Sequence, residues 1–401
     1  MTIQDYQQLE EFFQTKSKSV NTRFVRFLYN RINWDVRLIG IKGEKGVGKT
    51  TLLFQRIKLA HKGNNDVFYA SLDNLWFQSH TLMELVDWLY VHGIRHLFLD
   101  EVHKYKDWSI VIKNIYDTYA DLNIVYTGSS ILEIDYSRAD LSRRQTLYTL
   151  HGLSFREYLV LHKKVDVPPV SLQQLLEAHI EMGEPICQQI PVIKYFEQYL
   201  REGCYPFQLE AGNDYLLRLA EIINLEIETD LPAVEKLSYA TIQKTKQLLM
   251  VVAQNVPLVP NISKLSAQLE TTRDQCLKLL YALDRAGLLM LLTKEIKDYK
   301  HLVNPEKIYL GNTNLMFALC GNVNEGTLRE TFFLHQLTCD HQVCSSRRGD
   351  FMVDNTYLFE VGGKGKTFEQ IKDLPSSYLA IDGIEMGGRK RIPLWMFGFL
   401  Y

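Results

Sequence analysis

The segment Gly43–Thr50, GEKGVGKT, decides the fold of the N-terminal part of this 401-residue chain. It matches G-x-x-x-x-G-K-[ST], a pattern whose glycines let backbone N–H groups turn inward around a phosphate. Lys49 would reach the β- and γ-phosphates, and the Thr50 hydroxyl would ligate Mg²⁺. An apolar run at 36–41 precedes the segment and TTLLFQRIKLAHK follows with helical periodicity. The segment therefore has the strand, loop and helix context that phosphate binding requires, which disfavours a simple Gly-rich turn.

The predicted nucleotide-binding residues lie in this loop and in the first turn of the helix. They are Gly43, Gly46, Gly48, Lys49, Thr50 and Thr51. No N-K-x-D motif, which would recognise guanine, follows the loop. We therefore expect ATP rather than GTP, with Mg²⁺ as the metal cofactor.

A second apolar run, residues 95–101, ends in two acids, Asp100 and Glu101. Asp100 would hold the Mg²⁺ shell together with Thr50. Glu101 would orient or deprotonate the attacking water. Alone, acids after an apolar strand usually only begin a loop, but a phosphate-binding loop in the same region favours the catalytic interpretation.

Further runs indicate how the N-terminal region is organised. Residues 66–72 and 123–128 predict strands, and residues 107–120 predict a helix. Strands that alternate with helices predict a parallel sheet covered on both faces. The last strand leads into Thr127–Ser130, TGSS, where Ser129 would sense the γ-phosphate or the attacking water. A strand-ending turn or helix cap is the alternative interpretation.

Composition places the chain among ordinary globular proteins. It is 46% hydrophobic and 23% charged, with a net charge of −2. A nucleic-acid partner would therefore need a local basic patch. Six scattered cysteines form no CxxC pair, so we expect reduced thiols in a cytoplasmic protein. We expect no membrane span, because the strongest apolar stretch is interrupted by Asp284 and Arg285.

Several motifs in order resemble a prokaryotic AAA-type ATPase family. They are the loop at 43–50, the acids at 100–101 followed by VHKY and Trp108, TGSS at 127–130, and LSFREY at 153–158. Members of this family join an N-terminal ATPase to a C-terminal domain of unknown function, with a winged helix and a restriction-endonuclease-like fold. The resemblance covers about residues 20–165 closely and about residues 200–401 more loosely.

The resemblance implies an α/β fold with three domains. Residues 1–165 would form a P-loop AAA-type ATPase with a parallel sheet and flanking helices. Residues 166–300 would form a helical region with a winged helix, and residues 301–401 a small restriction-endonuclease-like α/β domain. Family members carry a Gly-Arg pair where this chain has Arg143 and Arg144. Arg144 would act as an arginine finger, which implies a homo-oligomer or a partner. A surface ion pair or an intramolecular sensor is the alternative.

The C-terminal half contains a helix–turn–helix–strand pattern over residues 261–292. In a winged helix that binds DNA, the recognition helix would carry Thr272, Arg273, Gln275 and Lys278. Many winged helices contact only protein, and the modest charge of the chain is compatible with that alternative.

The nuclease-like pattern near the C-terminus is incomplete. Its acids would be Glu330, Asp350 and Glu360, but Gly362 stands where the catalytic lysine is expected, and Lys364 follows two residues later. The stretch FEVGGKGKT at 359–367 is also no second phosphate loop, since Glu360 occupies the place of its first glycine. A scaffold or recognition module without cleavage is therefore favoured over an active nuclease.

These observations predict an ATP-binding protein whose Mg²⁺-dependent hydrolysis drives rearrangement of a C-terminal interaction or DNA-binding module. One alternative is an ATP-gated nuclease in DNA processing or defence. Another is a switch or scaffold that holds ATP with negligible turnover.

Overall fold

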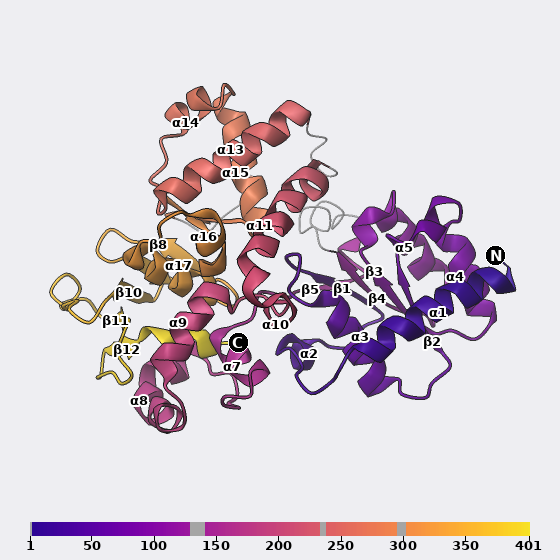
Figure 1. Ribbon diagram of the computed structural model, residues 1–401, viewed down its shortest axis with the longest axis horizontal. Helices are drawn as coiled ribbons and strands as arrows, with labels where there is room; N and C mark the ends of the chain where they lie inside the picture. Colours follow the sequence, from indigo (N-terminus) through magenta and orange to yellow (C-terminus); the bar gives the residue numbers. More distant parts are fainter. Residues whose placement is uncertain (1, 129–140, 233–237, 295–301) are drawn as a thin grey trace. The chain divides into compact units, whose positions relative to one another are not determined.

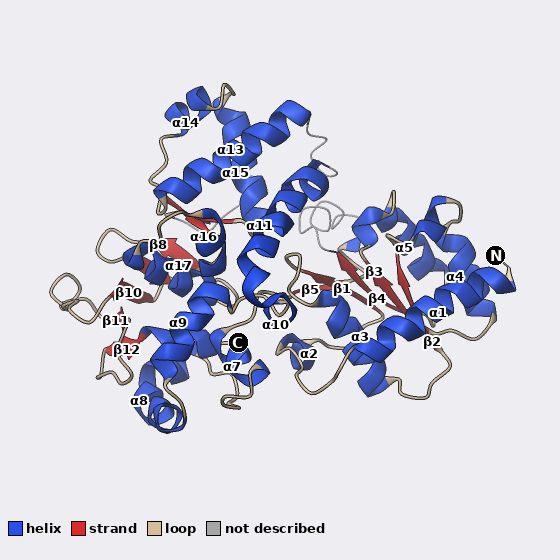
Figure 2. Ribbon diagram, viewed as in Figure 1, coloured by secondary structure: helices blue, strands red, loops and turns tan. Residues whose placement is uncertain are grey.

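The computed structural model describes residues 2–128, 141–232, 238–294 and 302–401. The chain divides into two compact units, residues 1–151 and residues 152–401. The elements of each unit are labelled in Figure 1 and coloured by type in Figure 2.

The first unit is built on a five-stranded sheet in the order β2-β3-β4-β1-β5. The strands are β1 (Leu38–Lys42), β2 (Val67–Ser71), β3 (His96–Asp100), β4 (Asn123–Gly128) and β5 (Thr146–Thr149). Every pairing in this sheet is parallel. The central strands β3, β4 and β1 are almost continuously buried, as expected for a sheet covered on both faces. Their carboxyl ends meet at one edge, where ligands of such sheets bind.

Helices cover this sheet (Figure 2). They are α1 (Ile3–Ser19), α2 (Leu28–Arg31), α3 (Lys49–Ala60), α4 (Leu82–Val91) and α5 (Trp108–Thr118), with short 3₁₀ turns η1 (Leu75–Gln78) and η2 (Val102–Lys104). Phe13 of α1 packs against Phe54 of α3 and Tyr69 of β2, at ring distances of 6.2 and 6.1 Å. The N-terminal helix thus belongs to the core of the first unit. The predicted parallel α/β architecture is confirmed for this part of the chain.

The second unit combines many helices with two small sheets. Its helices are α7 (Phe155–Leu161), α8 (Leu172–Gln189), α9 (Val192–Glu202), α10 (Gln208–Ala211), α11 (Tyr215–Leu225), α13 (Tyr239–Asn255), α14 (Ile262–Gln268), α15 (Arg273–Arg285), α16 (Thr313–Leu319) and α17 (Glu325–Leu337). Short turns are η3 (Gly212–Asp214), the π-helical η4 (Glu226–Asp230) and η5 (Leu394–Phe399). Strands β6 (Leu289–Leu292) and β7 (Lys307–Leu310) form an antiparallel pair.

The larger sheet of the second unit has the order β12-β11-β10-β9-β8. Its strands are β8 (Val343–Ser345), β9 (Phe351–Val353), β10 (Tyr357–Gly362), β11 (Ser377–Ile381) and β12 (Arg391–Pro393). β8, β9 and β10 pair antiparallel, whereas β10, β11 and β12 pair parallel. A mixed sheet of this kind requires a crossover between β10 and β11, and residues 363–376 provide it.

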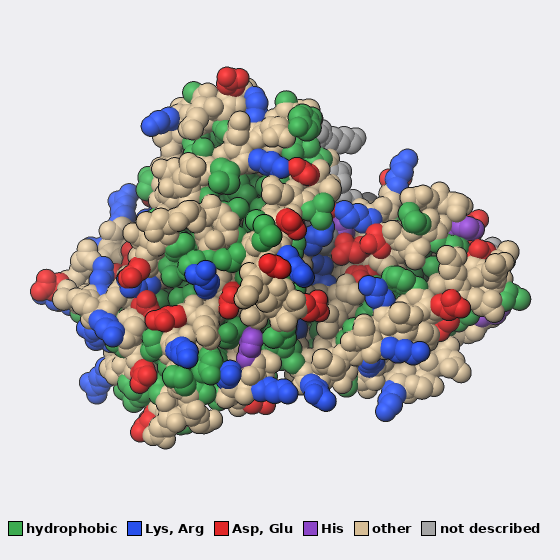
Figure 3. Space-filling view, in the orientation of Figure 1, with side chains coloured by type: hydrophobic (Ala, Val, Ile, Leu, Met, Phe, Trp, Pro, Cys, Tyr) green, Lys and Arg blue, Asp and Glu red, His purple; other side chains and the backbone are tan. Residues whose placement is uncertain are grey.

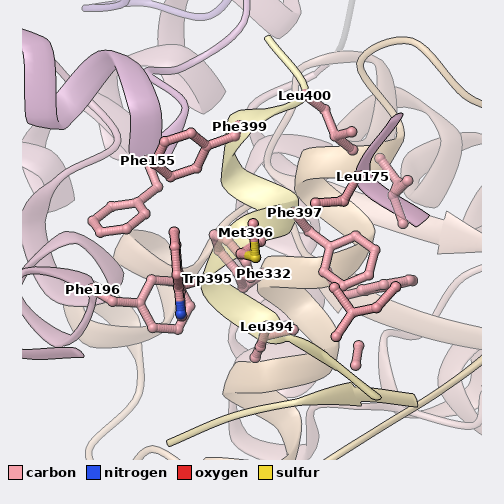
Figure 4. Packing of buried hydrophobic residues seen from close by; sticks show 14 of the residues in the cluster. Phe155, Leu175, Phe196, Phe332, Leu394, Trp395, Met396, Phe397, Phe399 and Leu400 are labelled. Carbon is pink, nitrogen blue, oxygen red and sulfur yellow. The ribbon is translucent and has the colours of Figure 1, made fainter. Parts of the chain in front are cut away.

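One hydrophobic core runs through the second unit. Figure 4 shows Phe155 of α7 and Phe196 of α9 beside η5, whose Trp395, Met396 and Phe399 point among them, and Phe332 of α17 lies nearby. These side chains are almost completely buried. Residues 166–300 and 301–401, expected as separate domains, therefore contribute to the same core.

The division of the chain also lies earlier than the expected boundary at residue 165. Helix α7 packs within the second unit, where the Ser154 hydroxyl and the Arg156 Nε both donate to the carbonyl oxygen of Tyr401, at 2.6 and 2.9 Å. The LSFREY segment thus begins the second unit instead of closing the first. Its polar side chains cap α7 and hold it to the end of η5.

Among the described helices, none combines the length and apolar character needed to cross a membrane. All six cysteines lie in described parts of the chain and are free thiols.

Candidate nucleotide-binding site

The phosphate-binding loop joins β1 to α3, as the sequence predicts. Gly46 and Gly48 adopt φ angles of 89° and 98°, a region that side chains with a Cβ rarely enter. At Gly43 a Cβ would lie 2.2 Å from the carbonyl oxygen of Leu150. Only glycine therefore allows Leu150, just after β5, to lie this close to the start of the loop. The glycines of the motif therefore serve both the turn and its packing.

Lys49 opens α3 and folds back over the loop. Its Nζ donates to the carbonyl oxygens of Gly43 and Glu44, both at 2.8 Å, and the residue is only 5% exposed. The ammonium group is thus held inside the loop that would enclose the phosphates. Thr51, in the same first turn of α3, is exposed.

Asp100, at the end of β3, is the centre of a hydrogen-bond network. Its Oδ2 accepts from the Thr50 hydroxyl at 2.6 Å and from the Tyr69 hydroxyl at 2.9 Å. Its Oδ1 accepts from the Thr127 hydroxyl of β4. Burial, reinforced by the charge on Asp100, raises the pKa of Tyr69, so this hydroxyl remains a donor at neutral pH. Three strands and the P-loop helix therefore converge on one carboxylate.

Glu101 follows in a left-handed backbone conformation, with φ of 52°. A non-glycine residue there carries a backbone cost of about 1 kcal/mol. Its side chain, 23% exposed, approaches the buried His103, with 3.4 Å between Oε2 and Nε2. The turn thus presents this carboxylate next to the Asp100 network and beside an imidazole.

The residues at this edge suit a magnesium ion. Mg²⁺ prefers hydroxyl, carboxylate and phosphate oxygens, and the Thr50 hydroxyl and Asp100 carboxylate lie within hydrogen-bond distance. Across the described residues, no group of three or more His, Cys, Asp or Glu side chains is arranged to hold a metal by itself. Thr50 and Asp100 are thus the residues that would hold the ion.

The two other predicted residues of this site are Ser129 and Arg144. Ser129 lies outside the described residues. Arg144 pairs with Asp117 of α5 in the same unit, through Nε to Oδ1 at 2.8 Å and Nη2 to Oδ2 at 3.0 Å. The neighbouring Arg143 is exposed. Arg144 thus forms a partly exposed ion pair within the first unit, which corresponds to the surface ion pair that the sequence left as one alternative.

A family comparison agrees with this geometry, since residues 35–159 match the model described as an AAA domain. This region is an AAA-type P-loop domain. The AAA domain supports nucleotide binding by the first unit. Its match extends into α7, which packs in the second unit.

Similarity to one curated relative extends beyond the AAA domain. An uncharacterized protein of Methanocaldococcus jannaschii is 27% identical over 391 residues, which cover 88% of this chain and 81% of that protein. The similarity therefore includes the second unit.

Solved structures give weaker matches. AMPPCP-bound DnaA from Aquifex aeolicus matches with a TM-score of 0.27 and 15% identity, covering 64% of this chain and 84% of that chain. Domain III of the Thermotoga maritima replication initiation protein DnaA matches with a TM-score of 0.24 and 13% identity, covering 43% and 91%. Scores of this size establish neither a shared ligand nor a shared role.

The predicted recognition helix is α15, preceded by α14 and followed by the β6–β7 pair. The Thr272 hydroxyl caps α15 by accepting from the Gln275 N–H at 3.2 Å. Arg273 and Lys278 are exposed. On the face of the second unit seen in Figure 3, basic and acidic side chains are interspersed without a continuous basic area.

Of the predicted nuclease-like residues, Glu330 and Asp350 lie near each other. Burial raises the pKa of Glu330, and the charge on Asp350 acts in the same direction. Glu330 accepts from the Tyr309 hydroxyl of β7 and lies 3.6 Å from Lys307 Nζ. Asp350 Oδ2 accepts from the Val361 N–H at 2.8 Å. Both acids are thus engaged with protein groups.

Glu360 lies on the face of the sheet opposite α17. Its strand neighbours Phe359 and Val361 pack in the main core with Phe333 of α17, whereas Leu358 belongs to a separate small cluster. Because side chains alternate along a strand, Glu360 shares the face of Leu358 and not that of α17. The strand therefore turns Glu360 away from the sheet face covered by α17, the helix that carries Glu330.

The lysine partner of Glu360 is Lys366 and not Lys364. Lys366 Nζ lies 2.6 Å from Glu360 Oε1. A Cβ on Gly362 would lie 2.8 Å from Lys366 Cβ and Cγ, so the missing side chain makes room for Lys366. The Lys364 side chain instead lies against Gly383.

Sequence reasoning missed three residues at the nucleotide site: Tyr69, His103 and Arg26, whose guanidinium donates to the carbonyl oxygen of Val47 in the phosphate-binding loop. Arg26 stands before any motif, and Tyr69 occupies an apolar strand whose sequence does not reveal a polar partner. His103 follows the acids in the VHKY segment. It stands two residues after Glu101, and this short spacing was the signal that could have identified it as a neighbour of that carboxylate.

Proposed function

We propose that the first unit is a Mg²⁺-dependent ATPase whose turnover drives a rearrangement of the second unit. The observation that carries this proposal is the 2.6 Å contact between the Thr50 hydroxyl and Asp100, beside a P-loop closed by Lys49. A hydroxyl and a carboxylate at this separation are the protein part of a magnesium–phosphate site. The match of residues 35–159 to an AAA domain supports nucleotide binding at this loop.

In this mechanism Lys49 exchanges the carbonyl oxygens of Gly43 and Glu44 for the β- and γ-phosphates of ATP. The inward N–H groups of the loop and the N-terminus of α3 hold the phosphate chain. Mg²⁺, held by Thr50 and Asp100, would supply charge neutralisation between the phosphates. Glu101 orients water and accepts its proton, and His103 holds the Glu101 carboxylate in place.

Three variants test this function. Lys49→Ala should abolish ATP binding, because the phosphates lose their cation. Glu101→Gln should keep ATP binding but slow hydrolysis by about 100-fold or more, the usual contribution of a general base. Lys62→Ala, which changes an exposed lysine in the same unit, is the matched control and should behave like wild type.

Binding and turnover should be measured separately, by calorimetry and by phosphate release. Wild-type protein that binds no ATP would contradict the proposal. Tight binding with no turnover would select the non-hydrolysing switch instead. If Arg144 acts on a neighbouring copy, specific activity should rise with protein concentration, and Arg144→Ala should remove that rise.

DNA binding by the second unit is a second candidate, favoured by the order α14, α15, β6, β7 with Arg273 and Lys278 exposed on α15. The double variant Arg273→Ala/Lys278→Ala should weaken binding to duplex DNA. It should also make the binding constant less dependent on salt concentration, by the amount expected for the loss of about two phosphate contacts. Wild-type protein without measurable DNA binding at low salt would contradict this second candidate function. Nuclease activity has no comparable support, because Glu330 and Asp350 are engaged with protein groups and Gly362 stands where the catalytic lysine is expected.

A further inference from the structure

Arg26 lies in the short segment between α1 and α2, ahead of the residues that match the AAA domain. It is 4% exposed. Its Nη1 donates to the carbonyl oxygen of Val47 at 2.5 Å, and its Nη2 donates to the carbonyl oxygen of His151 at 2.7 Å. One buried guanidinium thus bridges the phosphate-binding loop and the last residue of the first unit.

The first contact concerns the shape of the loop. A phosphate-binding loop turns its N–H groups inward, so carbonyl oxygens point outward and need donors of their own. Val47 is completely buried, which limits access of water to its carbonyl. Arg26 supplies the donor and holds this peptide in the orientation that leaves the N–H groups facing the phosphates.

The position of Arg26 is itself built by neighbouring contacts. Gln55 of α3 donates through Nε2 to the carbonyl oxygens of Asn21 and Phe24, at 3.1 and 2.7 Å. Lys58, one turn later, donates to the carbonyl of Val20. The segment that carries Arg26 is therefore fastened along the helix that begins at Lys49.

The second contact concerns the exit of the chain. The Leu150 N–H donates to the Lys42 carbonyl at 2.7 Å, so the chain leaves the first unit directly beside the start of the loop. His151 is the final residue before the division between the two units. A movement of the Val47 peptide would therefore displace Arg26, whose guanidinium also holds the His151 peptide.

We propose that Arg26 is a positioning residue that shapes the phosphate-binding loop and transmits nucleotide occupancy to the junction at residues 151–152. This inference rests on the proposed function, because it requires that the loop bind a nucleotide. Arg26 touches no substrate in this scheme and acts through the carbonyls of Val47 and His151.

The experiment compares Arg26→Gln and Arg26→Lys in the full chain, with Arg23→Gln as the control. Arg23 lies three residues earlier and is exposed. Two readouts are needed: ATP affinity by calorimetry, and hydrogen exchange of peptides covering residues 144–153 without and with saturating ATP. The second readout reports the junction, and the difference between its ATP-free and ATP-bound values is compared within each variant.

Wild type and Arg23→Gln should bind ATP equally and show slower exchange at residues 148–153 when ATP is bound. Arg26→Gln should bind ATP about tenfold or more weakly, the loss expected for two charge-assisted hydrogen bonds. At saturating ATP it should no longer slow exchange at the junction. Arg26→Lys keeps the charge but has one ammonium for two carbonyls, so it should recover part of the affinity and little of the junction response.

Unchanged affinity and an unchanged ATP-dependent exchange difference in both Arg26 variants would overturn the inference. If Arg26→Gln does not fold, Arg26→Lys decides by the same two readouts. Failure of wild-type protein to bind ATP is a separate outcome, which overturns the proposed function and the inference with it.

Discussion

Asp100 shows how one carboxylate is positioned by residues far apart in the sequence. Thr50 and Tyr69 share its Oδ2, and Thr127 donates to its Oδ1. Tyr69 is packed between rings, with Phe54 at 4.4 Å, so its hydroxyl cannot swing away from Asp100. In the proposed mechanism, Tyr69 would hold the Asp100 carboxylate in place if the Thr50 hydroxyl ligated a metal ion instead.

Tyr69→Phe should preserve the packing and remove only this hydrogen bond. We expect the Mg²⁺ concentration for half-maximal ATP hydrolysis to rise about tenfold, because a hydrogen bond to a charged group contributes about 1.5–3 kcal/mol. The measurement is a magnesium titration of phosphate release at fixed ATP. Tyr90→Phe removes a hydroxyl that donates to Asp121 at the surface and is the control. Identical titration curves for Tyr69→Phe and wild type would refute the assignment.

At the scale of elements, the β10–β11 crossover depends on an ion pair that only a glycine permits. Glu360 is 3% exposed, and Lys366 from the crossover reaches it across Gly362. A buried carboxylate that loses its cation is strongly disfavoured. The ion pair therefore fastens the crossover to the sheet.

Gly362→Ala places a methyl group where the Lys366 side chain lies and should displace the ammonium from Glu360. We expect a loss of about 1–3 kcal/mol in local stability. The check is hydrogen exchange of β10 and β11 peptides, which should become faster. Gly365→Ala is the matched control, because no atom lies within 4 Å of its added Cβ. Equal protection in both variants would mean that Lys366 does not stabilise this sheet.

Glu330 on α17 should make the stability of the second unit depend on pH. Burial raises its pKa above the ordinary value of 4.5. Between the unfolded and folded pKa values the folded chain binds more protons, so stability falls as pH rises through this window. Glu330→Gln should flatten that slope. Urea midpoints from about pH 4 to pH 7 test this, with exposed Glu325→Gln as control. An unchanged slope in Glu330→Gln would be the contrary result.

At the scale of the whole molecule, the two units divide after His151. Phe155, Tyr158 and Leu159 of α7 are buried in the second unit. A fragment of residues 1–165 should therefore expose an apolar helix, whereas a fragment of residues 1–151 should not.

We expect the shorter fragment to be monodisperse by size-exclusion chromatography and the longer one to aggregate. Their thermal midpoints should be similar, because the apolar side chains of α7 are buried in the core of the second unit. A fragment of residues 1–165 that stays monodisperse and melts several degrees higher would show that α7 belongs to the AAA domain's core after all.

The phosphate-binding loop, the apolar strands that carry Asp100 and Thr127, and the alternation of helices were predictable from sequence. Each depends on a short contiguous pattern, in which glycine spacing or burial period is set by neighbouring residues. Ser129 belongs to such a pattern too, although its place lies outside the described residues.

Sequence by itself determined the parallel α/β unit and its nucleotide loop, since those features are local. Only the tertiary structure decided where α7 packs, that Arg26 joins Val47 to His151, and that Lys366 instead of Lys364 meets Glu360. Spacing along a strand predicts which face a side chain takes, but a glycine-rich turn removes that constraint. The partner of a buried charge is then chosen by packing between segments that are distant in the chain.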